Sequence, residues 1–145
     1  MDSLLLIHFG MCLLMTGVIW LVQVVHYPSF AFVSVPQFFS FSRFHQSKIT
    51  MIVLPLMTIE LVTAVFLLMY VQTPLVMINL SLLLLIWIST FFLSMSIHRD
   101  LNHTKSDYLI KKLIVTNWPR TIIWSLRSGI IYYVLVSSSG VIYEV

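Results

Sequence analysis

The chain has 145 residues, of which 59% are hydrophobic and 9% are charged, and its mean hydropathy is +0.99. Soluble domains keep roughly a quarter of their residues charged, so this composition excludes one and predicts an integral membrane protein in contact with the lipid bilayer. The net charge of +3 comes from basic residues scattered beside apolar segments, which is not the clustered pattern of a nucleic-acid-binding surface. A single cysteine, Cys12, excludes an internal disulfide.

Four apolar stretches predict one domain, residues 1–145, that forms an all-α four-helix bundle in the membrane. Each crossing needs about 20 predominantly apolar residues, and the chain is long enough for four crossings. The predicted spans cover about residues 4–25, 48–70, 75–97 and 119–138.

The first span lacks the basic start of a signal peptide and is longer than the apolar part of one, so we expect it to be retained. Pro28 is expected to end its helix. The phenylalanines of residues 29–44 suit a segment that lies in the membrane interface. The second helix is predicted to begin near Pro36, to bend at Pro55 and to end near Tyr70.

The third span carries four polar or aromatic side chains at helical intervals, which are expected to share one face: Trp87, Thr90, Ser94 and His98. The most polar part of the chain, residues 98–107, follows this span. Thr104 or Ser106 is expected to cap the last helix, which bends at Pro119.

The basic residues predict the orientation of the chain. All eight belong to the two longer connections or to the helix ends beside them: Arg43, Lys48, Arg99, Lys105, Lys111, Lys112, Arg120 and Arg127. By the positive-inside rule these connections are cytoplasmic and both termini lie outside, in the cytoplasmic membrane if the source is bacterial.

The same map suggests an internal duplication of a helix pair. A shift of 72 residues places three polar residues of the first half on three of the second: His26 on His98 (98 − 26), His45 on Asn117 (117 − 45) and Lys48 on Arg120 (120 − 48). Sites in membrane proteins with such repeats occur at the interface between the repeats.

A polar stripe enters the last span, because Asn117, Arg120, Trp124 and Arg127 fall on one helical face. Polar groups in a span face other protein or water. Arg120 and Arg127 are therefore expected to hold an anionic group, such as a propionate, a carboxylate or an oxyanion. Glu60 is expected to serve either as the ion-pair partner of Arg127 or as a proton carrier.

Histidines at the span ends suggest two kinds of cofactor site. His26 and His98 can ligate a haem iron axially, and with His45 they can instead hold a transition metal. The alternative is that these histidines are interfacial anchors. Gln23 shares a face with His26. His8 is expected to be packed or interfacial rather than a ligand.

The layout resembles the anthrone-oxygenase-like family of small four-helix membrane proteins. The resemblance lies in a first span that ends near Tyr27-Pro28, a phenylalanine-bearing connection and the Asn117-Trp118-x-Arg120-Thr121 start of the last span. It implies oxidation of a hydrophobic, often aromatic substrate. The span-end histidines and Glu60 do not match a motif of that family.

The leading hypothesis is thus a membrane oxidoreductase or oxygenase-like protein that acts on a hydrophobic small molecule, with haem or a transition metal as the candidate cofactor. The alternatives are a non-catalytic subunit or assembly factor of a larger membrane complex and, less favoured, an oligomeric transporter or channel. The candidate residues are Glu60 and Arg120 for catalysis, Gln23, His26, His98, Asn117, Trp124 and Arg127 for cofactor binding, and His26, His45 and His98 for a metal.

Overall fold

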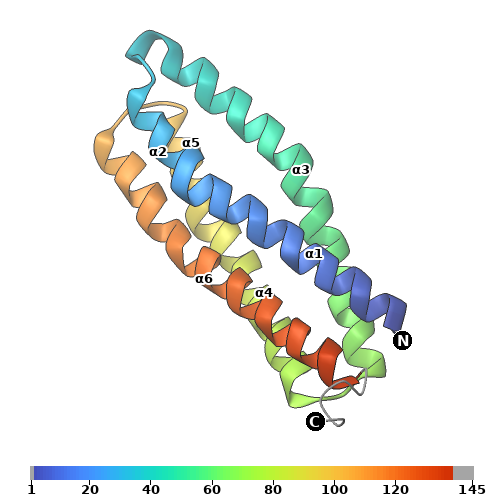
Figure 1. Cartoon of the computed structure of the whole chain (residues 1–145). Coiled ribbons are helices and arrows are strands. Elements are labelled where there is room, and N and C mark those ends of the chain that lie inside the picture. Colours follow the sequence, from blue (N-terminus) through green and yellow to red (C-terminus); the bar gives the residue numbers. More distant parts are fainter. Residues whose placement is uncertain (1, 139–145) are drawn as a thin grey trace.

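The structure, a computed structural model, describes residues 2–138 and contains helices and short connections, with no strand in that range. Four helical segments are long and apolar enough to cross a membrane: Ser3–Phe32, Val35–Tyr70, Pro74–Leu101 and Asp107–Ser138. They form an elongated bundle (Figure 1). The prediction of an all-α, multi-pass membrane four-helix bundle is confirmed.

The first segment is longer than expected because Pro28 does not end it. Helix α1 (Asp2–Leu21) continues through a π-helical turn, η1 (Val22–His26), into α2 (Tyr27–Ser29) and the 3-10 turn η2 (Phe30–Phe32). In the π turn the N–H of Tyr27 donates to the carbonyl of Val22, five residues back. This wider turn accommodates a proline ring that would clash with the preceding carbonyl of a regular α-helix.

The second segment agrees with the prediction, since α3 runs from Val35 to Tyr70 with a proline in its first turn and Pro55 inside it. Thr73 then caps the third segment by accepting the N–H of Val76. That segment comprises α4 (Pro74–Ser89), a second π turn, η3 (Thr90–Ser94), and α5 (Met95–Leu101).

The last helix, α6, spans Asp107–Ser138, so it begins directly after Ser106, one of the two expected caps. The helix starts have the spacing of the suggested duplication: α4 begins 72 residues after α1 (74 − 2), and α6 begins 72 residues after α3 (107 − 35). The internal prolines of α3 and α6 do not match, because Pro55 and Pro119 are 64 residues apart (119 − 55).

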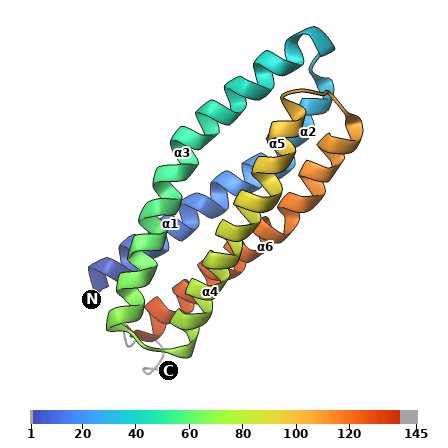
Figure 2. The same cartoon turned by 180° about the vertical axis from the view of Figure 1, so that it is seen from behind.

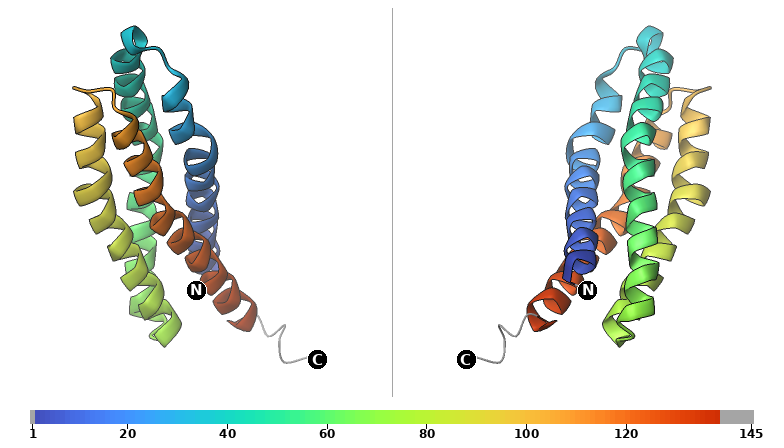
Figure 3. Two further views of the ribbon diagram at one scale, coloured as in Figure 1. Left: turned by 90° about the vertical axis from the view of Figure 1, so that its left-hand side faces the viewer. Right: turned by 90° about the vertical axis from the view of Figure 1, so that its right-hand side faces the viewer.

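The four segments form a closed ring of contacts, in which α1 and α4 each pack against both α3 and α6. The start of α1, the end of α6 and the 71–73 turn lie at one end of the bundle, and the two longer connections lie at the other (Figures 1 and 2). Side views show α6 crossing obliquely behind or in front of its neighbours (Figure 3). The basic connections therefore share one end, as the charge rule requires.

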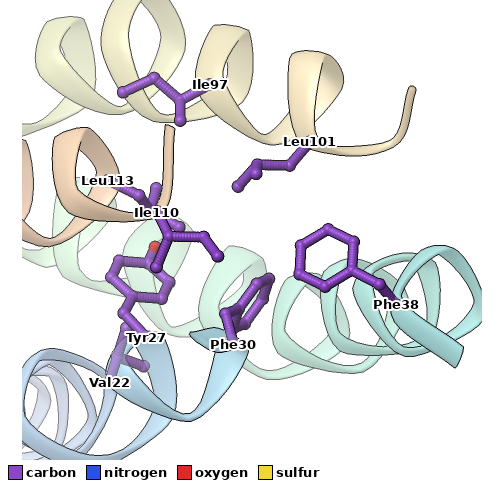
Figure 4. Close-up of a cluster of buried hydrophobic side chains, with 8 residues drawn as sticks. All are labelled: Val22, Tyr27, Phe30, Phe38, Ile97, Leu101, Ile110 and Leu113. Atoms are coloured by element: carbon purple, nitrogen blue, oxygen red, sulfur yellow. The ribbon is translucent and has the colours of Figure 1, made fainter. Parts of the chain in front are cut away.

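An apolar cluster fills the bundle at the end with the longer connections (Figure 4). It consists of Val22, Tyr27, Phe30, Phe38, Ile97, Leu101, Ile110 and Leu113. The interfacial interpretation of residues 29–44 is therefore only partly right. Phe30 and Phe38 are core residues, whereas Phe32 is 88% exposed and Phe44 is 62% exposed. Residues 35–44 form the first turns of α3, which have one buried and one exposed face. The content of phenylalanine alone does not show which phenylalanines lie on the buried face.

Candidate functional site

A buried ion pair lies at the middle of the bundle. Glu60 Oε1 on α3 lies 2.6 Å from Arg127 Nη1 on α6, and both side chains are fully buried. Trp124 Nε1 donates to the other carboxylate oxygen of Glu60 over 3.2 Å. The expected pairing of Glu60 with Arg127 is confirmed, and both carboxylate oxygens are occupied.

The remaining donors of Arg127 contact Asn79 on α4. Arg127 Nε donates to the backbone carbonyl of Asn79 over 3.2 Å, and Nη2 donates to its side-chain Oδ1 over 3.1 Å. In return, Asn79 Nδ2 donates to the carbonyl of Arg127 over 3.3 Å. Arg127 Nη2 also lies 3.8 Å from Cys12 Sγ, so the guanidinium contacts polar groups of α1, α3 and α4.

His8 completes this central layer from α1. Its Nε2 lies 3.2 Å from Asn79 Oδ1, and its Nδ1 lies 2.9 Å from Thr63 Oγ1. Asn79 Oδ1 accepts from Arg127 Nη2, so the proton of the His8–Asn79 hydrogen bond is assigned to Nε2 of His8. Each of the four membrane-spanning segments therefore contributes a side chain to the central layer, and the polar groups of the layer are paired. Such pairing is typical of a hydrogen-bond network that stabilises the fold. His8 is packed, as expected.

A second polar layer surrounds Arg120, nearer the end with the longer connections. Asn117 Nδ2 donates to Gln23 Oε1 over 2.7 Å, and Arg120 Nη2 donates to Asn117 Oδ1. Arg120 Nη1 donates to Thr90 Oγ1 over 3.4 Å. Arg120 is only 4% exposed, its Nε has no partner, and no carboxylate of residues 3–138 forms an ion pair with it.

The three candidate histidines lie together beside this layer. The ring centroids of His26 and His45 are 4.1 Å apart, and those of His45 and His98 are 5.6 Å apart. Tyr27 Oη lies 3.2 Å from His98 Nε2. One ring nitrogen of each histidine is buried without a partner: Nε2 of His26, Nε2 of His45 and Nδ1 of His98.

The arrangement of these rings does not favour the proposed cofactors. Within residues 3–138 no group of three or more histidine, cysteine or acidic side chains is positioned to hold a metal ion. A haem would need a slot for its porphyrin between two axial ligands, whereas the ring of His45 contacts the rings of both His26 and His98. The haem and metal hypotheses therefore remain predictions without support from this geometry.

A cavity of about 290 Å³ lies between the two polar layers. Most of its wall is apolar, with Met15, Ile19, Val53 and Met57 among the lining residues. Its polar lining includes four side chains that each have one buried atom without a partner: Trp87 Nε1, Ser94 Oγ, His98 Nδ1 and Arg120 Nε. The predicted shared face of the third helix, with Thr90 as its fourth member, lines this cavity.

The cavity adjoins a groove between α3 and the η3–α5 segment, and the two share Ile49, Thr50, Phe91, Met95 and His98 in their walls. The groove has a volume of about 650 Å³. Phe91 and Met95 are half exposed on the surface that faces lipid. The side chains shared by the two walls thus separate the cavity from the groove on the outer surface.

Both π turns adjoin this cavity, η1 through Val22 and η3 through Thr90 and Ser94. Turn η1 bears Gln23 and His26, and turn η3 bears Thr90 and Ser94. Single π turns inside α-helices occur frequently at functional sites, since the extra residue redirects the side chains around it. Turn η3 therefore places polar groups in the cavity wall, whereas those of η1 lie in the Arg120 layer and the histidine cluster.

Of the predicted site residues, the structure brings Gln23, His26, His45, His98, Asn117 and Arg120 together and places Glu60 and Arg127 in the separate central layer. Trp124 belongs to both, because it lines the cavity and bonds to Glu60. Sequence reasoning missed Tyr27 and Asn79 as members of the two layers. A lone asparagine within an apolar span is itself a polar intramembrane residue and could have been singled out.

Comparisons of the chain with protein-family models, with curated proteins and with solved structures find no match.

Proposed function

We propose that this protein is a membrane oxidoreductase of the oxygenase-like kind, which binds a hydrophobic small molecule in the cavity and oxidises it there. The observation that carries the proposal is the set of four buried polar atoms without partners around one apolar-walled cavity. Leaving a buried donor or acceptor unsatisfied costs about 1–3 kcal/mol. Four such atoms at one place are explained by a ligand that supplies their partners.

The polar groups have the chemistry that an oxidation of a C–H or O–H bond requires. His98 presents Nδ1 to the cavity, while its Nε2 is held by Tyr27 and the ring is thereby oriented. In this position the imidazole can take a proton from a bound substrate. Arg120 presents Nε beside it and can stabilise the negative charge that develops. The electrons would pass to molecular oxygen, as the resemblance to anthrone oxygenases implies, or to a bound cofactor.

Oxygen consumption by the purified protein in lipid nanodiscs, supplied with a total lipid extract, tests the reaction. We expect His98→Asn to abolish the consumption, because the proton acceptor is lost. The matched control is His103→Asn, since His103 is exposed in the polar connection. Equal rates for the two variants, or no consumption by the unaltered protein, would refute the proposal. An absorption spectrum of the oxidised and reduced protein, with metal analysis, tests the haem and metal versions separately.

A groove on the outer surface favours a second candidate function, a subunit of a larger membrane complex. Trp20 and Trp118 meet edge to face with ring centroids 5.8 Å apart, and they line an apolar groove of about 610 Å³ along α6. Such a groove can receive a helix of a partner protein. Co-purification of a stoichiometric partner, lost in Trp118→Ala, would support this function.

A further inference from the structure

The geometry points to a single-chain carboxylate as the ligand of the cavity, an inference that rests on the proposed function because it names the substrate class for the same site. Its starting point is charge. Among residues 3–138 the buried acidic and guanidinium side chains are Glu60, Arg120 and Arg127, and Glu60 and Arg127 form an ion pair. Arg120 is left as an uncompensated positive charge inside a membrane bundle, an arrangement that is costly until an anion joins it.

The number of free donors fits one carboxylate. Arg120 donates from Nη2 to Asn117 and from Nη1 to Thr90, whereas its Nε–H is buried without a partner. Ser94 Oγ and Trp87 Nε1 add two donors. A carboxylate has two oxygens with about four lone-pair sites and one negative charge, so three donors and one cation satisfy most of it. A phosphate monoester would bring up to two negative charges, against the single positive charge of Arg120.

The volume fits one apolar chain. At about 30 Å³ for each non-hydrogen atom, as in a liquid, the cavity of about 290 Å³ holds on the order of ten atoms. A longer chain must displace the side chains shared by the two walls to extend into the groove between α3 and η3–α5. The carboxylate would lie at Arg120 and the tail would point towards Phe91 and Met95.

The headgroup donors are held in place before a ligand arrives. Gln23 accepts from Asn117 and donates to the carbonyl of Ile114 over 3.1 Å, and Asn117 in turn accepts from Arg120. The guanidinium is therefore fixed by a chain of hydrogen bonds between η1 and α6. Binding then loses little side-chain entropy, which favours affinity for a small headgroup.

Tryptophan fluorescence in nanodiscs tests the inference with decanoate, decanol and decyl phosphate, which share one chain. The background protein carries Trp20→Phe and Trp118→Phe, so that emission comes from Trp87 and Trp124 in the cavity wall. We expect decanoate to bind about ten-fold or more tightly than decanol, because a charge-assisted hydrogen bond replaces a neutral one. Arg120→Gln should remove this preference, whereas Arg43→Gln, at an exposed site outside the cavity and the groove, should keep it.

Ser94→Ala keeps the test independent of folding. Ser94 Oγ has no partner in the protein, so its removal should leave the unfolding midpoint unchanged while it weakens decanoate binding several-fold. Equal affinity for decanol and decanoate, tighter binding of decyl phosphate, or an unchanged decanoate affinity in Ser94→Ala would each overturn the inference. If the unaltered protein binds decanoate but consumes no oxygen, the proposed function alone is refuted.

Discussion

Replacing Glu60 by Gln leaves the guanidinium of Arg127 fully buried without its carboxylate. Breaking a buried ion pair by removal of one partner costs about 3–5 kcal/mol, because the remaining charge is uncompensated. We therefore expect Glu60→Gln alone to lower the free energy of unfolding by about this amount, measured by SDS titration in mixed micelles. The double variant with Arg127→Gln should lose less than Glu60→Gln alone, since it buries no charge and its amides can still bond to Trp124 and Asn79.

An exposed pair provides the control for this cycle. Arg99 and Asp100 lie 4.0 Å apart, and their side chains are 75% and 52% exposed. Arg99→Gln and Asp100→Asn should each change the unfolding free energy by no more than about 0.5 kcal/mol, with no measurable coupling. If the losses of Glu60→Gln and Arg127→Gln simply add, the two groups are not coupled and the reasoning is wrong.

Three further predictions concern the buried polar groups. Asn79→Ala should destabilise the protein by about 2–4 kcal/mol, because it leaves donors of both Arg127 and His8 without an acceptor; a loss below about 0.5 kcal/mol in the same SDS titration would contradict the assigned network. Cys12 is fully buried, so a maleimide should label it only in SDS-unfolded protein, and rapid labelling of the folded protein would disprove its position. His45→Phe should leave the thermal unfolding midpoint unchanged or raise it, because Nε2 has no partner; a large drop would show that the imidazole binds something, a metal included.

The pairing of charges in the membrane could be predicted from the sequence because it follows from the free-energy cost of an unpaired charge in the bilayer. An isolated carboxylate such as Glu60 in an apolar span must find a partner, and Arg127 was the cation at a matching depth. The ends of the second helix were predictable for a similar reason, since Pro36 and the uncharged 71–74 turn are local features. These inferences needed no knowledge of packing.

The cavity and the π turns could not be predicted in this way. Pro28 was taken as a helix end because a proline disrupts a regular α-helix, whereas here the wider turn at Val22–His26 accommodates it. Whether Phe30 is buried and Phe32 is exposed depends on how the 3-10 turn meets α3 and α6. The free Nε of Arg120 likewise emerges only once Asn117 and Thr90 occupy its neighbouring donors.

The ion pair between α3 and α6 has a consequence for how the chain is made. Glu60 enters the membrane with α3, and about half of the chain must follow before Arg127 arrives on α6. A polar residue at a helix centre disfavours insertion, and α6 carries both Arg120 and Arg127. The carboxylate of Glu60 and the amide of Asn79 are already in place when α6 is synthesised, so they offer Arg127 partners that lipid cannot. Membrane integration of the last helix is thus coupled to assembly with the first three.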